Sequence, residues 1–185
     1  GSQLGVEYVG THLGSAKDWV DDKKSIETPQ EALKQVVKGL KEVYKGNPKL
    51  SSQLLLEIAA GSGSIIGDTF EELAFLLDHV GQKDMHVCLD TCHMFAAGYD
   101  LRTKDAVEET MKQFRKHVGV PHLKLVHMND SKADLGGRAD RHDHMGKGKI
   151  GAAGLKAVLA HKDFQKVNFI LETKHDSLID KDLAF

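Results

Sequence analysis

Histidine and carboxylate side chains recur where short apolar runs of this chain end. Reading down the sequence, these run-end residues are His12, Glu57, Asp90, His127 and Glu172. Imidazole nitrogen together with carboxylate oxygen suits zinc, manganese or iron(II), and the mixture alone does not choose between them. Carboxylates crowded at one place repel one another unless a cation lies among them. If the fold gathers these five positions, they therefore predict a metal centre.

Further candidate ligands lie just beyond two of these runs. His93 follows Asp90 by three residues, where a strand is ending, so the two side chains can reach neighbouring metals. Residues two apart in an extended segment point the same way, so Asp140 and His142 can grip one ion while Arg141 faces away, toward a phosphate. We expect the other histidines to be surface or packing residues; they are His79, His86, His117, His122, His144, His161 and His175.

Helical patterns separate the apolar runs, which cover residues 6–12, 54–57, 86–90, 123–127 and 167–172. A first helix is predicted from Pro29, with Thr28 as its N-cap and Glu31 completing a capping box. A second capping box at 69–72 predicts a helix through residue 80. Two more helices are predicted over 104–117 and around 155–159.

Strands that alternate with helices and read as near-continuous apolar runs are typical of a parallel α/β sheet. In a parallel α/β barrel the C-terminal ends of the strands meet at one face, which carries the active site in essentially every characterised barrel enzyme. The five run-end ligands would converge on that face. No repeat, low-complexity tract or linker divides residues 1–185, so we expect a single domain.

The composition limits how this protein can meet a partner. The formal net charge of the sequence is −2, whereas a protein that binds DNA by charge alone has a strongly positive net charge. Binding to nucleic acid therefore needs locally gathered basic residues or bound metal. The two cysteines form neither a CxxC nor a disulfide pattern, so we expect an intracellular, reducing location. We expect Cys88 in a buried strand, neither thiol as a ligand, no signal peptide and no membrane span.

Two glycine-rich segments, 60–67 and 146–151, follow candidate ligands. Their backbone amides, free of side-chain crowding, can line an anion site. The second segment belongs to a locally basic region that contains Lys132, Arg138, Arg141, Lys147 and Lys149. Together these features indicate phosphate handling. The alternatives are that the glycines simply turn the chain and that the charged loop is only solvated.

Several of these segments resemble the endonuclease IV family. The most specific are Asp90-Thr91-Cys92-His93, His127-Met128-Asn129-Asp130-Ser131-Lys132 and Asp140-Arg141-His142. The similarity extends from about Val6 to Thr173. It implies an α/β fold, a TIM (β/α)8 barrel of which this chain holds the last five β/α units. It also implies a zinc-dependent endonuclease of base excision repair that hydrolyses the phosphodiester 5′ to an abasic site in DNA.

Residue by residue, the resemblance assigns the ligands to three zinc sites. Glu57 would bridge the first two ions, and His12 would bind the first. Asp90, His127 and Glu172 would complete the second site, and the third would be held by His93, Asp140 and His142. A hydroxide between the first two ions would be the nucleophile, so Glu57 and Glu172 would act catalytically as metal-bound residues. The abasic nucleotide would be flipped out of the duplex to reach the metals.

The sequence departs from the family beside two ligands, with Leu13 where proline is usual and Ile58 where asparagine is usual. The family's first three strands, and with them one histidine of the first zinc site, have no counterpart in this sequence. Two protein ligands, His12 and Glu57, are too few for a tight zinc site. We therefore expect this chain alone to hold the first zinc weakly, with impaired hydrolysis until the N-terminal strands are supplied.

The expected partner is double-stranded DNA with abasic sites, with no membrane association and a monomeric full-length protein. One alternative is a metal-dependent sugar isomerase or epimerase of the xylose-isomerase-like group, which shares the barrel and the strand-end ligands. Such an enzyme needs one or two metals, usually manganese or magnesium. A further alternative is an inactive fragment of the nuclease. The additional ligands His93, Asp140 and His142 favour the nuclease over the sugar isomerase, which does not need them.

Overall fold

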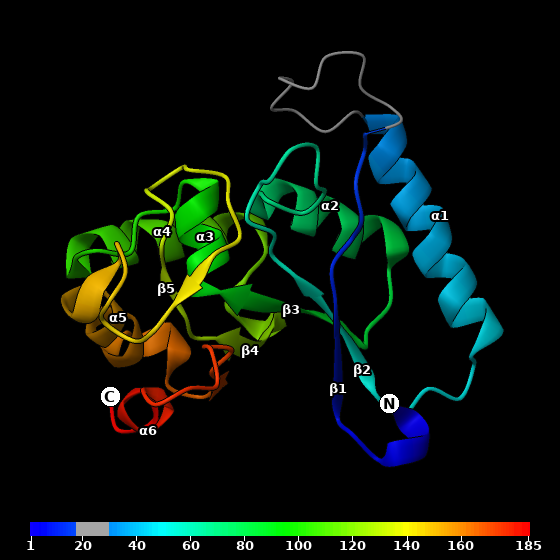
Figure 1. The fold of residues 1–185 in the computed structure, drawn as a ribbon. Helices are drawn as coiled ribbons and strands as arrows, with labels where there is room; N and C mark the ends of the chain where they lie inside the picture. Colours follow the sequence, from blue (N-terminus) through cyan, green and yellow to red (C-terminus); the bar gives the residue numbers. More distant parts are fainter. Residues whose placement is uncertain (18–29) are drawn as a thin grey trace.

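A computed structural model of the protein describes residues 1–17 and 30–185. Five strands form one sheet in the order β1-β2-β3-β4-β7, and every neighbouring pair is parallel (Figure 1). The strands are β1 (Tyr8–Thr11), β2 (Gln53–Glu57), β3 (Met85–Asp90), β4 (Leu123–His127) and β7 (Asn168–Ile170). The predicted parallel α/β sheet is confirmed.

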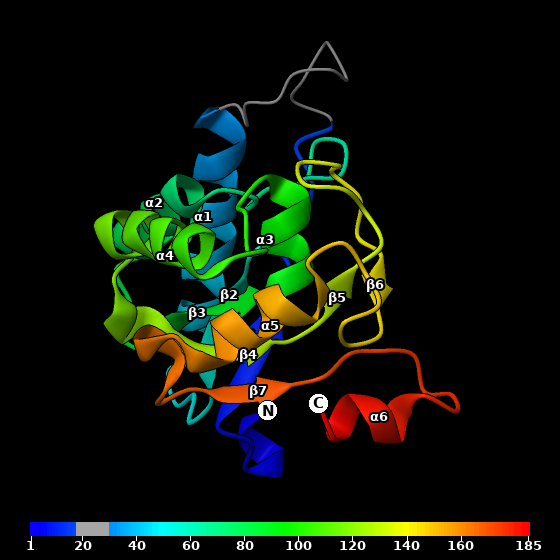
Figure 2. The same cartoon turned by 90° about the vertical axis from the view of Figure 1, so that its left-hand side faces the viewer.

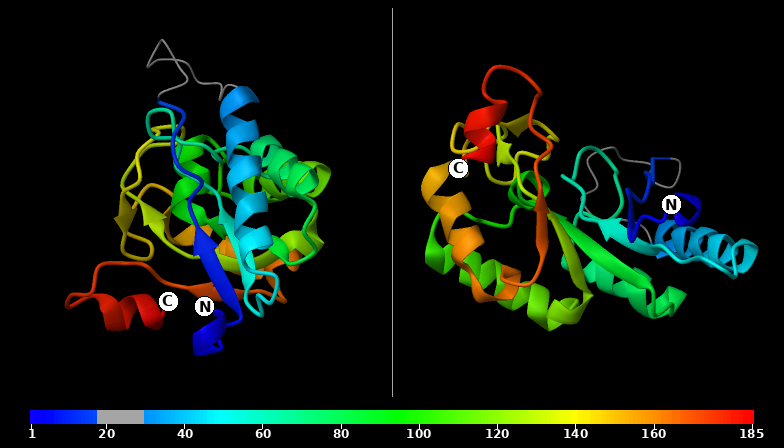
Figure 3. Two further views of the ribbon diagram at one scale, coloured as in Figure 1. Left: turned by 90° about the vertical axis from the view of Figure 1, so that its right-hand side faces the viewer. Right: turned by 90° about the horizontal axis from the view of Figure 1, so that it is seen from below.

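Four long helices cover one face of this sheet. They are α1 (Gln30–Gly46), α2 (Phe70–Val80), α4 (Lys104–His117) and α5 (Gly151–Ala160). α1 packs on α2, α2 on α4 and α4 on α5, so the helices follow the strands around the sheet (Figure 3). The main core lies between the two layers, and fully buried side chains in it include Phe70, Phe95 and Phe114. This packing aligns the strands so that their C-terminal ends form one rim.

Side-chain caps set where two of these helices begin. The Thr69 hydroxyl accepts a hydrogen bond from the Glu72 amide at 3.2 Å, so the predicted N-cap half of the second capping box is confirmed at the start of α2. The Glu72 carboxylate accepts from the Gly67 amide at 2.6 Å, which ties the preceding loop to the helix. Thr103 caps α4 in the same way. The first predicted capping box involves Thr28 and Pro29, which lie outside the described residues.

The other face of the sheet carries a smaller apolar cluster. Leu55, Cys88 and Leu125 are buried there, with Tyr8 packed against them. Cys88 lies in β3 with no exposed surface, so its predicted place in a buried strand is confirmed. Figure 3 shows the sheet curving with the helices on its outer side. No helix within residues 1–17 and 30–185 is long and apolar enough to cross a membrane.

Shorter elements, which the sequence pattern does not predict, complete the fold. Three of them are 3-10 helices that precede strands: η1 (Ser2–Leu4), η2 (Val120–His122) and η3 (Lys162–Phe164). The others are α3 (Thr91–Ala97), β5 (Asp130–Ser131), β6 (His142–Asp143) and α6 (Ile179–Leu183). β5 and β6 pair in an antiparallel ribbon beyond β4, next to α3 (Figure 2). α3, β5 and β6 follow β3 and β4, so they lie at the end of the sheet where the candidate ligands are. The 3-10 helices lie at the opposite end, where the strands begin.

β7 is shorter than the apolar run that predicts it. The strand ends at Ile170, two residues before Glu172. Its last carbonyl still accepts a hydrogen bond from the Met128 amide at 2.8 Å. Beyond that point a side chain takes the place of a strand partner, because the Asn129 side-chain oxygen accepts from the Glu172 amide at 2.9 Å. Glu172 therefore leaves the sheet but stays fixed beside it.

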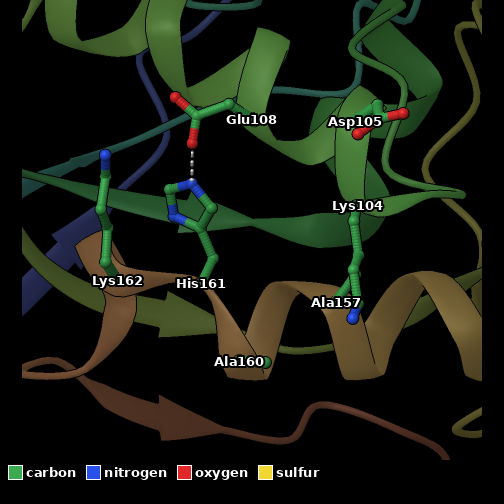
Figure 4. Close-up of a pocket in the computed structure, with 7 residues that line it drawn as sticks. All are labelled: Lys104, Asp105, Glu108, Ala157, Ala160, His161 and Lys162. Carbon is green, nitrogen blue, oxygen red and sulfur yellow. Dashed lines mark hydrogen bonds and ion pairs between the residues drawn. The ribbon is translucent and has the colours of Figure 1, made fainter.

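An ion-pair network, here called the α4–α5 clamp, consists of Glu108, Arg115, His161 and Asp163. Arg115 donates to Glu108 on the same helix and, at 2.5 Å, to Asp163 in η3. His161, where α5 ends, lies 2.8 Å from the Glu108 carboxylate through Nε2 (Figure 4). Glu108 and His161 line a surface pocket of about 390 Å³ between the helices. The clamp therefore joins two helices of the outer layer, on the outside of the sheet.

The clamp lowers the pKa of Glu108. Hydrogen bonds from His161 and then Arg115 bring the pKa of this carboxyl from its ordinary 4.5 to about 2. A carboxyl whose pKa falls on folding stabilises the fold above its unfolded pKa, and this contribution is lost as the pH drops toward the folded value. The Glu108 side chain is 49% exposed, so solvent screening keeps the contribution small.

We predict that Glu108→Gln lowers the melting temperature near neutral pH, because it removes the charge that the clamp binds. Its deficit against the unmodified protein should shrink as the pH falls from about 5 toward about 2, where the native carboxylate also becomes protonated. Thermal unfolding followed by circular dichroism at several pH values measures this. Glu109→Gln is the control, since it removes a carboxylate of the same helix without touching the clamp. A deficit that does not change with pH would contradict the prediction.

Candidate metal centre

The C-terminal ends of four neighbouring strands bring one set of predicted ligands together. Glu57, Asp90, His127 and Glu172 each offer a ligand atom, and these atoms lie within 4.8 Å of one another. The Nδ1 atom of His127 is 2.9 Å from Glu57 Oε1 and 3.1 Å from Glu172 Oε2. The spacing arises because residues paired across parallel strands point the same way, as Asp90 and His127 do in the β3–β4 register. We call these four residues the strand-end set.

A second set, here called the loop set, consists of His93, Asp140 and His142. The Oδ1 atom of Asp140 is 3.1 Å from His93 Nε2 and 3.3 Å from His142 Nε2, and the two nitrogens are 3.3 Å apart. Atoms bound to one zinc ion at about 2.0–2.2 Å in a tetrahedron lie about 3.4 Å from one another. A single proton serves one donor–acceptor pair, whereas a metal ion accepts a lone pair from all three atoms. The geometry of the loop set therefore fits a metal ion.

His12 meets the strand-end set from the edge of the sheet. It follows β1, and its Nε2 lies 3.8 Å from Glu57 Oε2. His12, Glu57 and His93 also offer ligand atoms within 4.8 Å of one another, so Glu57 belongs to two groups. The structure thus brings all eight predicted ligands to one rim. Their individual metal assignments stay predictions.

The unpredicted helix α3 positions His93. Asp90 ends β3 and caps α3, because its Oδ1 accepts a hydrogen bond from the His93 amide at 2.9 Å. The Nδ1 atom of the His93 ring lies 3.0 Å from the Ile58 carbonyl oxygen, which leaves Nε2 directed at Asp140 and His142. Metal-binding histidines commonly donate their second ring nitrogen in this way. Because the contact uses the Ile58 backbone, the departure from asparagine at that position does not remove it.

Asn129 is a functional residue that the sequence reasoning did not single out. It is fully buried, and its amide donates to Asp90 Oδ2 at 2.7 Å. Its side-chain oxygen accepts from the Glu172 amide, and its backbone is tied to the Thr91 hydroxyl through both N–H and C=O. One side chain thereby holds the Asp90 carboxylate at the end of β3 and the backbone of Glu172 beyond the end of β7. A buried polar residue directly after the apolar run of β4 was the available signal.

Neighbouring side chains raise the pKa of His127. Burial alone lowers its pKa, but contacts with Cys88, Glu172 and Glu57 outweigh burial and raise the pKa to about 12. The hydrogen bond between His127 and Glu172 lowers the pKa of the Glu172 carboxyl. The set therefore binds positive charge strongly, either as a proton on His127 or as a metal ion in its place.

Burial and neighbouring charges also shift the pKa values of Asp90 and His93 in opposite directions. Burial raises the pKa of the Asp90 carboxyl, against the influence of His93 and His142. Burial lowers the pKa of His93, yet Asp90 and Asp140 turn the net shift upward. Both shifts reflect charges that are removed from water and must be matched by neighbours.

Cys92 lies near the loop set, within 4.8 Å of ligand atoms of Asp90 and His142. Burial raises the pKa of its thiol to about 12. That Cys92 is not a ligand stays a prediction.

Backbone amides of the second glycine-rich segment, which were predicted to bind a phosphate, donate hydrogen bonds to a carboxylate of the protein itself. The fully buried Asp130 accepts hydrogen bonds from the amides of Gly148, Ile150 and Gly151 at 2.9–3.3 Å. A Cβ at Gly148 would lie 2.4 Å from the Ser131 carbonyl oxygen, so the close approach requires glycine. These amides hold the loop against β5 and are already satisfied.

The basic residues around that segment are partly paired within the protein. Arg138 donates to Asp68 at 2.9 Å, and Lys149 lies 3.5 Å from Asp134. Arg141 and Lys147 are exposed. Lys132 lies 3.9 Å from Asp143, and the side chains of Lys132 and Lys149 are 56% and 58% exposed. All four of these exposed cationic residues lie within 132–149, the stretch that also carries Asp140 and His142.

Six of the seven other histidines make local contacts, and His175 is exposed. His144 lies between Asp176 and Asp182, which docks α6 against the β6 loop (Figure 2). His161 belongs to the α4–α5 clamp, and His79 stacks on Phe75. The remaining contacts are those of His117 with Glu71 and of His86 with His122.

Comparison with known proteins shows which family this sequence matches. The family described as "Xylose isomerase-like TIM barrel" matches residues 1–185. A probable endonuclease 4 of Nitrosopumilus maritimus is 42% identical over 177 residues, covering 95% of this chain and 60% of that protein. An apurinic-apyrimidinic endonuclease of Caenorhabditis elegans is 41% identical over 172 residues, covering 92% and 41%.

A solved structure gives the same relationship. The crystal structure of endonuclease IV from Thermus thermophilus matches with a TM-score of 0.79 and 35% identity, covering 98% of this chain and 59% of that one. The chain thus spans 60%, 41% and 59% of the lengths of these three relatives.

We predict that Asp130→Ala lowers the free energy of unfolding by about 3 kcal/mol or more. The substitution leaves three amides of the glycine-rich loop without their acceptor, and each buried unpaired donor costs about 1–3 kcal/mol. Urea unfolding measures the change. Asp134→Ala, whose side chain is 84% exposed in the segment between β5 and β6, is the control and should change stability little. A cost below about 1 kcal/mol would mean that the loop does not depend on Asp130.

We also predict that His142→Ala removes about one bound ion per chain, because Asp140 and His93 alone are too few ligands for a tight site. Zinc added in excess and then passed through a desalting column, followed by elemental analysis, gives the stoichiometry. His79→Ala on the outer helix α2 is the matched control. Equal metal content in His142→Ala and the unmodified chain would remove His142 from the ligands.

Proposed function

We propose, from the premise that this chain belongs to the xylose isomerase-like TIM barrel family and to its endonuclease IV branch, that the protein is a metal-dependent endonuclease acting at abasic sites in DNA. The observation that carries the proposal is the adjacency of the strand-end set and the loop set at one rim. A sugar isomerase or epimerase has no need for the loop set. A phosphodiester, by contrast, presents several charged oxygens that neighbouring metal ions can share.

The residues present fit zinc at both sets. The loop set offers two imidazoles and one carboxylate with tetrahedral spacing, and the strand-end set offers one imidazole and three carboxylates. Divalent ions, when bound there, would supply an activated water and neutralise the charge that develops on a phosphate. Glu57 has one oxygen facing His127 and the other facing His12, so it is placed to be shared between adjoining ions.

Exposure of the ligands sets the direction from which the substrate arrives. The side chains of His12, Asp140 and Glu172 are 46%, 54% and 41% exposed. Those of Asp90 and His93 are 0% and 2% exposed. The buried residues would therefore hold metal ions on the side away from solvent, and a scissile phosphate would approach the exposed side of the rim.

Backbone recognition would come from the loop beside that rim. Arg141 lies between Asp140 and His142 in sequence and is exposed, as is Lys147. Cations on this loop would contact phosphates that flank the abasic site, and such contacts orient the duplex without reading its sequence. A flipped abasic nucleotide would then bring its 5′ phosphate to the exposed ligands.

We predict zinc-dependent cleavage of a duplex with one abasic site, on its 5′ side, that Glu57→Gln reduces by at least about 100-fold. Loss of residues that merely orient metal ligands typically costs 10–100-fold, and Glu57 serves two groups at once. The chain is assayed alone and together with the N-terminal strand segment of a relative, because the relatives are longer. Gel analysis of end-labelled DNA gives the cleavage position.

Glu71→Gln is the control for that experiment, since its carboxylate is exposed on α2. Cleavage that persists in Glu57→Gln, or that survives complete removal of metal, would contradict the proposed mechanism. Absence of cleavage in the supplemented chain, combined with epimerisation of a ketose, would replace the nuclease with the sugar-isomerase alternative.

A further inference from the structure

Arg138 occupies an unusual place in the loop that precedes Asp140. Its φ of 51° is the only positive value for a non-glycine residue among 1–17 and 30–185. A left-handed backbone is unfavourable for a side chain such as arginine, and it persists only where surrounding contacts hold it. The loop is therefore fixed at this residue by something outside itself.

Three separate contacts supply that fixation. The Arg138 amide donates to the Ala96 carbonyl at 2.9 Å, and the Arg138 carbonyl accepts from the Ser62 hydroxyl at 2.9 Å. The guanidinium donates through Nη2 to Asp68 at 2.9 Å. Ala96 lies on α3, whereas Ser62 and Asp68 lie in the loop after β2. One residue thus ties its loop to two others.

The Asp68 carboxylate is built into the fold as a partner for this arginine. Its side chain is 5% exposed, while that of Arg138 is 31% exposed. A Cβ on Gly61 would lie 2.8 Å from the Asp68 carboxylate and 3.1 Å from the Arg138 guanidinium carbon. The absence of a side chain at Gly61, whose φ is 76°, is what leaves room for the ion pair. We call Asp68, Arg138, Ser62 and Gly61 the loop strut.

The strut lies between the elements that bear the loop set. His93 is on α3, the helix to which the Arg138 amide is bonded. Asp140 follows Arg138 by two residues, is 54% exposed and belongs to no helix or strand. His93 is already fixed by the Ile58 carbonyl, so the position of Asp140 relative to His93 depends on how its loop is attached.

We infer that Arg138 is a positioning residue for the loop set: held by Asp68, it fixes the Asp140 loop against α3 so that Asp140 and His93 can share one metal ion. The inference rests on the proposed metal centre. It assigns to the Asp68–Arg138 pair a function in metal binding, besides any contribution to stability. The residue acts through Asp140 and touches neither the metal nor the substrate.

The test is a zinc titration of the whole chain, with His142→Ala used to identify the binding step of the loop set. The main variant is Asp68→Asn with Arg138→Gly. It removes the ion pair, leaves no buried unpaired charge and keeps a residue that tolerates the left-handed backbone. We expect the affinity of the loop-set step to fall by about tenfold or more, as for other residues that orient metal ligands. The strand-end step should keep its affinity.

Two further variants separate positioning from general stability. Arg138→Lys retains a cation that can face Asp68 and should recover most of the affinity. Arg115→Ala breaks the α4–α5 clamp, and it should lower the melting temperature without weakening either zinc step. If the double variant does not fold, Ser62→Ala serves instead, because it removes only the hydrogen bond to the Arg138 carbonyl and should weaken the loop-set step severalfold.

The outcomes distinguish this inference from the proposed function. If the unmodified chain shows no zinc step that His142→Ala removes, the proposed metal centre is wrong. If that step exists and either the folded double variant or, in its place, Ser62→Ala binds within about twofold of the unmodified chain, the positioning role of Arg138 is wrong. Equal weakening by Arg115→Ala would reduce the effect to stability and also overturn the inference.

Discussion

Mutual repulsion among carboxylates is the constraint on which the rest of this structure depends. Glu57, Asp90, Asp140 and Glu172 lie at one rim, and two of them are almost completely removed from water. Such an arrangement is unfavourable unless each charge is matched by hydrogen bonds, imidazoles or a cation. The surrounding polar contacts, above all those of Asn129, hold the ligands in spite of this repulsion. Contact with Cys88 and then with carboxylates raises the pKa of His127, and nearby carboxylates raise that of His93.

The regular part of the fold could be predicted because local signals and tertiary packing agree in it. Apolar runs marked the five strands, and Thr69 marked a helix start that the structure confirms. The positions of the ligands followed from one rule, that parallel strands end on the same side. α3 escaped prediction because its seven residues are buried nearly throughout and show no amphipathic period. β7 ended early because a side chain, Asn129, replaced a strand partner.

The loops could not be derived from sequence, because their meaning depends on partners far along the chain. The glycines at 146–151 suggested a site for an external anion. In the structure, amides of this segment bind the Asp130 carboxylate instead. Arg138 looked like one member of a basic region, yet its partner Asp68 lies 70 residues earlier. In both places the sequence pointed to groups that bind anions. It did not show that these groups bind carboxylates within the protein.

Asp90 performs two tasks with its two oxygens. Oδ1 caps the first turn of α3, and Oδ2 accepts from Asn129 and faces His142 at 3.6 Å. If the Asp90 carboxylate rotated to change its contacts with Asn129 and His142, it would lose the hydrogen bond that caps α3. The folding of a helix turn and the assembly of a ligand cluster are therefore a single cooperative event at this residue. In the proposed metal centre, a substitution at Asp90 would therefore alter the start of α3 as well as metal binding. Substitutions at the exposed candidate ligands His12, Asp140 and Glu172 would not carry that second cost.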